Sequence, residues 1–266
     1  MKKTILLILV LSFMMIFVFQ LGFAEDGEII NTDNLSKGMI SVTYSSADAV
    51  KFKVLITKGD QKISYPFSPD GTRVNFPLQL GNGKYSIGLL KNVSGTKYVY
   101  VSQKSVELSL TDPNVVYLNS VQNINFSEEM KAIDFGKTLL SKDKTTNDKV
   151  KSLYNYLVKG MAYDYSKIAK LTSEYIPSVE QTYADMKGIC YDYSALFASI
   201  QRYHGIPTRL VKGYSKYVEG YHAWNEVFID GKWVIIDNTV DNTWKGSKTG
   251  LTMFKSSKDY TKVNDY

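Results

Sequence analysis

The hydrophobic period of the chain changes near Asn125, and this change divides the fold in two. Before it, over about residues 38 to 118, apolar and polar residues alternate in short runs such as 39–44, separated by glycine-containing turns. Short strands at this spacing, with no helical segment among them, predict an antiparallel β-sandwich within residues 25–125. Such a region serves spacing, targeting or substrate docking, or it is purely structural, and the sequence does not decide between these roles.

After Asn125, apolar residues recur at helical spacing and then return to alternation. The predicted elements are a helix at 127–140, a second one that contains 150–157 and ends at Gly160, and a third at 190–203, followed by strands at 208–214, 222–229 and 232–237. Helices and strands that are segregated along the chain predict an α+β domain over residues 126–266.

The N-terminal segment, residues 1–24, has the layout of a secretory signal peptide. Two lysines precede an apolar run from Ile5 to Phe19, and small residues up to Ala24 form a cleavage site. The run is shorter than the roughly 20 residues of a membrane-spanning helix, which favours cleavage after Ala24 over a retained membrane anchor. We therefore expect a bacterial protein that is secreted or associated with the cell surface or cell wall.

Composition excludes several kinds of site. One cysteine rules out an internal disulfide and a multi-cysteine cluster, and two histidines leave little material for a metal centre. We therefore expect no metal and no cofactor. The net charge of +6 is spread along the chain without a Lys/Arg block, so we expect no nucleic-acid partner.

The single cysteine, Cys190, is predicted in the first turn of its helix. Unpaired backbone N–H groups and the helix dipole stabilise a thiolate there, and the thiolate is the nucleophilic form of cysteine. The alternative is an inert core cysteine. His204 lies at the far end of the same helix, about 21 Å away at 1.5 Å per residue. Only His222 is therefore left to pair with Cys190.

A hairpin predicts the partner of His222. Asp230-Gly231 between apolar strands is typical of a two-residue turn. In that register Trp224 faces Asp237, and His222 lies diagonally across the ladder from Asp237 on the same face. A shift of one residue would put the two on opposite faces. The predicted carboxylate–imidazole contact would fix the tautomer of His222 and hold the imidazolium that forms when the ring takes a thiol proton.

These residues lie in motifs that resemble the transglutaminase-like superfamily, whose fold is related to that of papain-type cysteine proteases. The matching segments are 188–197 (GICYDYSALF), 205–209 (GIPTR), 213–214 (GY), 222–227 (HAWNEV) and 233–239 (WVIIDNT). By that resemblance, Cys190 is the nucleophile, His222 the general base and acid, and Asp237 the residue that orients His222. The chain has Asn238 where the family often has a proline.

Three further residues are candidates for the site. The backbone N–H of Cys190 would be one oxyanion donor, and Tyr163 is a candidate side-chain donor, with simple packing as the alternative. Trp224 and Trp233 are candidates for the walls of a substrate groove, with packing inside the hairpin as the alternative.

The leading hypothesis is thiol acyl transfer on a peptide or glutamine carboxamide group of a protein or peptide substrate. A thioester on Cys190 is resolved by an amine, which cross-links, or by water, as in a peptidase or deamidase of cell-wall or surface proteins. A non-catalytic wall-binding scaffold is the alternative from another class, and a complete triad argues against it. Papain-like wall peptidases whose third residue is a second histidine fit less well, because His204 is misplaced.

Overall fold

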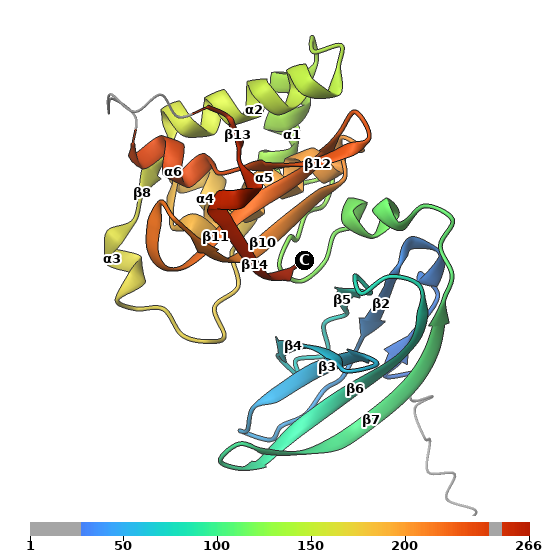
Figure 1. The fold of residues 1–266 in the computed structure, drawn as a ribbon. Helices are drawn as coiled ribbons and strands as arrows, with labels where there is room; N and C mark the ends of the chain where they lie inside the picture. Colours follow the sequence, from blue (N-terminus) through green and yellow to red (C-terminus); the bar gives the residue numbers. More distant parts are fainter. Residues whose placement is uncertain (1–27, 245–251) are drawn as a thin grey trace, which may run out of the picture.

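Residues 28–244 and 252–266 are described by a computed structural model, which contains a β-sandwich and an α+β part (Figure 1). The predicted α+β fold class with an N-terminal antiparallel sandwich is confirmed. The signal peptide predicted at residues 1–24 lies outside the described residues. Within the described ranges, no helix combines the length and the apolar character needed to cross a membrane.

The sandwich consists of two antiparallel sheets. One has the order β1 (Ile30–Asn31), β2 (Met39–Val42), β5 (Val74–Pro77), and the other has the order β4 (Gln61–Phe67), β3 (Phe52–Lys58), β6 (Gly83–Ser94), β7 (Lys97–Leu108). In β3, Phe52, Val54 and Ile56 are buried, and the residues between them are partly exposed. The alternation in the sequence thus marks the face that packs into the core.

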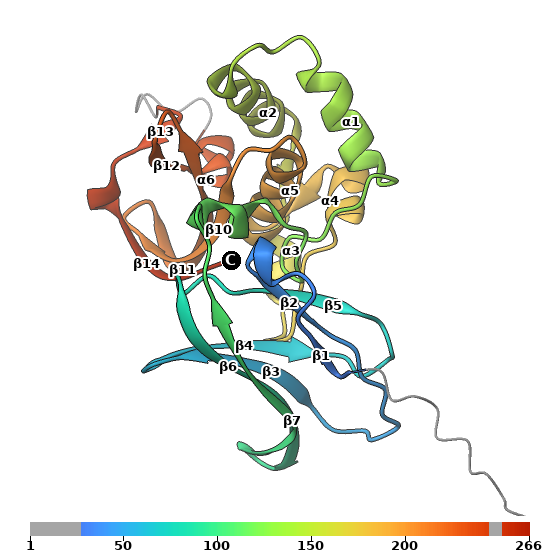
Figure 2. The same cartoon turned by 90° about the vertical axis from the view of Figure 1, so that its right-hand side faces the viewer.

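Two short 3-10 helices flank these strands, η1 (Leu35–Lys37) before β2 and η2 (Pro113–Leu118) after β7. The helices of the α+β part are α1 (Lys131–Leu140), α2 (Thr146–Gly160), α3 (Tyr165–Ile168), α4 (Val179–Asp185), α5 (Cys190–Tyr203) and α6 (Asn238–Thr243). Figure 2 shows α1, α2, α4 and α5 on one side of the large sheet.

That sheet is five-stranded and antiparallel. Its order is β13 (Phe254–Lys255), β12 (Lys232–Ile236), β11 (Val218–Ile229), β10 (Thr208–Ser215), β14 (Tyr260–Asp265), with the 3-10 helix η3 (Ser257–Asp259) before β14. A separate parallel pair joins β8 (Ala162–Tyr163) to β9 (Lys187–Gly188). The predicted helix at 190–203 has the bounds of α5, whereas α3, α4, α6, β13 and β14 were not predicted.

Helix α5 is the centre of the α+β part, and nearly all of its residues are buried. Helix α1 approaches it closely at Gly136, where a Cβ atom would lie 2.7 Å from Cγ2 of Ile200. The glycine that interrupts the predicted helix at 127–140 is therefore needed for helix packing rather than for helix termination.

The last residues of the chain, at the end of β14 and directly after it, pack against the sandwich. The ring of Tyr266 packs edge-on against Tyr65, with centroids 5.7 Å apart, and Gln79 Nε2 donates to the carbonyl of Asp265 at 3.0 Å. One continuous apolar cluster includes residues of both parts. The domain boundary at residue 125 stays a prediction.

Candidate active site

Cys190 is the first residue of α5, and its position depends on how that helix begins. The carboxylate of Asp192, which is fully buried, accepts a hydrogen bond from the backbone N–H of Ile189 at 2.9 Å. Gly188 makes room for this contact, since a Cβ atom there would lie 2.6 Å from Cβ of Asp192. The half-buried thiol of Cys190 thus lies at a helix N-terminus, as predicted from the sequence.

The hairpin between β11 and β12 has the predicted two-residue turn. Asp230 and Gly231 have φ values of 50° and 80°, as in a type I′ turn, and Phe228 pairs with Trp233 across the ladder. This register brings His222 Nε2 to 2.8 Å from Oδ2 of Asp237. The predicted contact between the two side chains is therefore present.

Asp237 is fully buried and accepts three hydrogen bonds. Besides His222, the hydroxyl of Tyr260 donates to Oδ2 at 2.9 Å, and the backbone N–H of Val240 donates to Oδ1 at 3.0 Å. Burial by itself would raise the pKa of Asp237, but the charge of His222 and these hydrogen bonds lower it below its usual value. The carboxylate is therefore ionised inside the protein and oriented toward the imidazole.

His222 lies between Asp237 and Cys190, and its side chain is only 2% exposed. Burial by itself would lower the pKa of His222, but the Asp237 carboxylate and a side-chain hydrogen bond with Cys190 raise it to about 10. Because Nε2 is bound to Asp237, Nδ1 is the ring nitrogen left for the thiol. This arrangement can take a proton from Cys190 while the carboxylate stabilises the imidazolium.

Tyr163 also contacts Cys190, and it lies in the short strand β8, where it pairs with Gly188 of β9. Burial, together with the charge and the hydrogen bond of Cys190, raises the pKa of the Tyr163 phenol, so it stays protonated. A protonated hydroxyl beside the sulfur is suitably located to donate to an oxyanion that forms there.

Two cavities meet at Cys190 and His222, with volumes of about 550 and 280 Å³. Both are lined by Leu171 and Tyr221, while Tyr163 and Trp244 line only the larger one. Two hydrogen bonds hold the segment that contains Leu171 against the start of α5. Asp192 accepts one from Lys167 Nζ, before Leu171, at 2.7 Å and one from the Tyr175 hydroxyl, after it. A groove with the thiol at its centre follows from this arrangement.

The expected groove role of Trp224 and Trp233 does not agree with the structure. Trp224 is 1% exposed and packs on Tyr260, with centroids 4.9 Å apart. Trp233 packs on Tyr117 at 5.3 Å and lies under the guanidinium of Arg209. Neither lines a cavity beside Cys190, because Tyr260 and Tyr117, which lie outside the hairpin, pack against the two rings. The aromatic walls come instead from residues that the sequence analysis missed, such as Tyr221 and Trp244, and no periodicity marked them.

His204 follows the last residue of α5, and its Nδ1 lies 2.8 Å from the carbonyl oxygen of Ile200. It lines neither cavity at Cys190. Within residues 28–244 and 252–266, no group of three or more His, Cys, Asp or Glu side chains is arranged to hold a metal ion.

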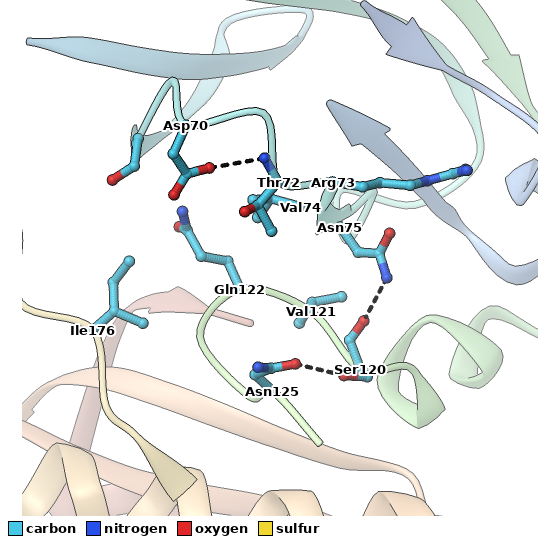
Figure 3. A pocket seen from close by; sticks show the side chains of 11 residues that line it. Asp70, Thr72, Arg73, Val74, Asn75, Ser120, Val121, Gln122, Asn125 and Ile176 are labelled. Carbon is cyan, nitrogen blue, oxygen red and sulfur yellow. Dashed lines mark hydrogen bonds between the residues drawn. The ribbon is translucent and has the colours of Figure 1, made fainter. Parts of the chain in front are cut away.

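A further cavity of about 300 Å³ lies between the sandwich and the α+β part, and Figure 3 shows its lining. Its polar groups bond mainly with each other, since Asp70 accepts from the backbone N–H of Thr72 at 2.8 Å and Asn75 Nδ2 donates to the carbonyl of Ser120 at 3.3 Å. Its lining includes neither cysteine nor histidine. The one cysteine of the chain lines the groove at Cys190 and not this cavity.

The contacts of His222 with Cys190 and with Asp237 define a cysteine-centred site that joins a thiol, an imidazole and a carboxylate. Residues 133–238 match the sequence profile of the Transglutaminase-like superfamily. This part of the chain is thus a transglutaminase-like domain, as the motifs predicted.

A human relative, kyphoscoliosis peptidase, is 26% identical over 111 residues, which is 38% of this chain and 17% of that protein. The chain therefore matches less than a fifth of the length of this curated relative. Among solved structures, a putative cysteine protease from Cytophaga hutchinsonii is 14% identical with a TM-score of 0.48, and the match covers 86% of this chain and 79% of that one. The periplasmic domain of TgpA from Pseudomonas aeruginosa is 16% identical with a TM-score of 0.38, and the match covers 76% and 71%.

Proposed function

We propose that the protein is a cysteine-dependent acyl transferase or hydrolase that acts on peptide or glutamine carboxamide groups, with Cys190, His222 and Asp237 as its catalytic residues. One observation carries this proposal: His222 contacts both Cys190 and the buried Asp237, and it does so where two cavities meet. A scaffold has no physical need for a buried carboxylate, an imidazole and a thiol in this order.

The first half of the reaction forms a thioester. His222 Nδ1 takes the proton of the Cys190 thiol, and the sulfur attacks the carbonyl carbon of the substrate. The developing oxyanion accepts hydrogen bonds from the backbone N–H of Cys190 and from the hydroxyl of Tyr163. When the C–N bond breaks, His222 returns the proton to the leaving nitrogen, and ammonia or an amine departs.

The second half of the reaction decides between cross-linking and hydrolysis. An amine or a water molecule then attacks the carbonyl carbon of the thioester while His222 takes a proton from it. When the C–S bond breaks, His222 gives this proton to the sulfur, and the thiol is regenerated. Two cavities meet at the sulfur, so an acceptor can approach through one while the acyl group occupies the other. This geometry supports transfer to an amine, and hydrolysis is its competitor.

Thiol labelling tests whether the site is catalytic. The chain has a single cysteine, so iodoacetamide reports on Cys190 alone, with Cys190→Ala as the blank. Alkylation at pH 7 faster than that of free cysteine supports the proposal. A rate equal to that of free cysteine contradicts it and favours a scaffold.

A second assay separates transfer from hydrolysis. A glutamine-containing protein is incubated with the enzyme and a labelled primary amine, and both ammonia release and amine incorporation are followed. Incorporation with ammonia indicates transfer, ammonia alone indicates a deamidase, and chain cleavage indicates a peptidase. If the thiol is reactive and none of these three outcomes is seen, the proposal of carboxamide and peptide substrates is contradicted.

We also propose that the protein works outside the cytoplasm, on substrates of the cell surface or cell wall. The support is the order of lysines, apolar run and small residues in the first 24 positions of the sequence. Fractionation of the producing cells, with N-terminal sequencing of the exported form, tests this location. A first residue at Glu25 is expected, and a full-length protein in the cytoplasm contradicts the proposal.

A further inference from the structure

The smaller cavity beside Cys190 contains a lysine that the proposed reaction does not use. Lys212 lies on β10, opposite Ala223 of β11 and next to the pair formed by Gly213 and His222. Lys212, Cys190 and His222 all line this cavity of about 280 Å³. A cationic side chain therefore lies in the same small space as the proposed nucleophile.

Lys212 has no anionic partner in the part of the chain that the structure describes. Its ammonium lies instead on aromatic faces, 3.5 Å from the ring centroid of Tyr191 and 5.3 Å from that of Tyr266. Other lysines near this sheet have carboxylate partners, as Lys216 has in Asp259 and Lys262 in Glu226. Burial lowers the pKa of Lys212 to about 8, and the charge of Cys190 acts against this shift.

Partial burial of a cation without a counter-ion costs free energy unless another group compensates its charge. The cation–π contact with Tyr191 holds the ammonium at the cavity. Thr172, Ser173 and Tyr221, which each carry a hydroxyl group, line the same cavity. The cavity thus has the polar groups of an anion site beside an acyl-transfer centre.

We propose that Lys212 binds a carboxylate group of the peptide substrate, close to the carbonyl that Cys190 attacks. This inference rests on the proposed function of Cys190 and names the class of substrate, a peptide with a carboxylate next to the scissile or transferred group. A carboxylate is the anion that peptides themselves carry, either on an acidic side chain or at the chain terminus. Lys212 is then a specificity-determining residue.

A pair of alkylating reagents tests this charge recognition without knowledge of the natural substrate. Iodoacetate carries a carboxylate, and iodoacetamide is its neutral analogue of nearly the same size. The rate ratio of the two reagents at Cys190 is measured at pH 7 in the wild type, in Lys212→Met and in Lys212→Arg. Lys232→Met is the matched control, because Lys232 is an exposed lysine of the same sheet outside the cavity lining.

Loss of the charge is expected to lower the iodoacetate-to-iodoacetamide ratio by about tenfold in Lys212→Met. The ratio is expected to be largely retained in Lys212→Arg and unchanged in Lys232→Met. If Lys212 only stabilises the thiolate of Cys190, both rates fall together and the ratio stays constant, which overturns the proposal. An equal fall in Lys232→Met overturns it as well, because net charge then explains the effect.

A measurement on the wild type alone tests the carboxylate site even if the variants do not fold. Raising the salt concentration to about 1 M shortens the Debye length to about 3 Å, so the wild-type ratio is expected to fall toward that of free cysteine. A ratio insensitive to salt and equal to that of free cysteine overturns the carboxylate site. Slow reaction with both reagents, no faster than free cysteine, instead contradicts the proposed function of Cys190.

Protection experiments identify the source of the carboxylate. Short peptides with a free C-terminus or with a glutamate side chain are compared with their C-terminal amide and glutamine analogues as competitors of iodoacetamide. Stronger protection by the free C-terminus assigns the terminal carboxylate, and stronger protection by glutamate assigns the side chain. Equal protection by charged and neutral peptides, or equal protection of wild type and Lys212→Met, contradicts the proposal.

Discussion

The substitution Asp237→Asn removes the charge that keeps His222 protonated and leaves the shape of the site nearly unchanged. An asparagine retains an oxygen that can accept from the backbone N–H of Val240, so the start of α6 keeps its cap. The amide cannot compensate the imidazolium, whereas the burial of His222, 2% exposed, persists. We therefore expect the pKa of His222 to fall in this variant.

The size of the fall follows from the balance at the imidazole. The pKa of His222 is about 10, against an ordinary value of 6.5, so the folded protein favours the imidazolium. Without the carboxylate, only the contact with Cys190 opposes the effect of burial, so the pKa of His222 is expected to fall from about 10 toward its ordinary value of 6.5.

Nuclear magnetic resonance can measure this shift directly, because the chain has only two histidines. The imidazole resonances of His222 and His204 are followed from pH 4 to pH 11 in the wild type and in Asp237→Asn. His204 is an internal control, because burial lowers its pKa and it lies at the end of α5 opposite to Cys190. A His222 pKa that is equal in the two proteins would show that the Asp237 carboxylate does not raise it.

The same balance predicts how stability depends on pH. The raised pKa of His222 stabilises the fold fully below the ordinary value of 6.5, and this contribution is lost as the pH rises through about 10. The lowered pKa of Asp237 stabilises the fold above 3.8, and this contribution is lost as the pH falls through the folded value. Urea unfolding across the pH range should show both losses in the wild type and neither in Asp237→Asn.

Three further substitutions test other parts of the structure. Tyr163→Phe should lower kcat by about 10²–10³-fold with little change in KM, as expected for an oxyanion donor, and an unchanged kcat would leave Tyr163 with a packing role. Lys255→Met removes the partner of the buried Asp241, whose oxygens lie 2.5 and 2.7 Å from Lys255 Nζ, and should lower the free energy of unfolding by about 3–5 kcal/mol. Gly136→Ala should cost about 1–3 kcal/mol, because its Cβ would lie 2.7 Å from Ile200; a smaller cost in urea unfolding would show that α1 can move away from α5.

The parts of the site that the sequence predicted are those with local signals. A glycine-flanked helix start located Cys190, and the two-residue turn at Asp230-Gly231 fixed the register that brings His222 to Asp237. Both signals extend over a few residues, so backbone geometry alone was sufficient to interpret them. Helix α5 was predicted with its bounds for the same reason.

The parts that the sequence did not predict depend on contacts between distant segments. Trp224 and Trp233 were candidate groove residues, but their partners Tyr260 and Tyr117 come from elsewhere in the chain and pack against their rings. Lys212 was not predicted as a site residue, because a single lysine in a strand gives no local signal. Its contacts with Tyr191 and Tyr266 become visible only in the folded structure. Strand β14, which supplies the Tyr260 contact to Asp237, lay in a segment for which no structure had been predicted.

The most direct test of the catalytic arrangement is the alkylation rate of Cys190 by iodoacetamide at pH 6, in the wild type and in His222→Ala. At this pH a free cysteine is almost entirely in the unreactive thiol form, so fast alkylation requires an imidazole that holds the proton of the sulfur. We predict a wild-type rate at least about tenfold above that of free cysteine and a loss of this advantage in His222→Ala. Equal rates in the two proteins would contradict the account.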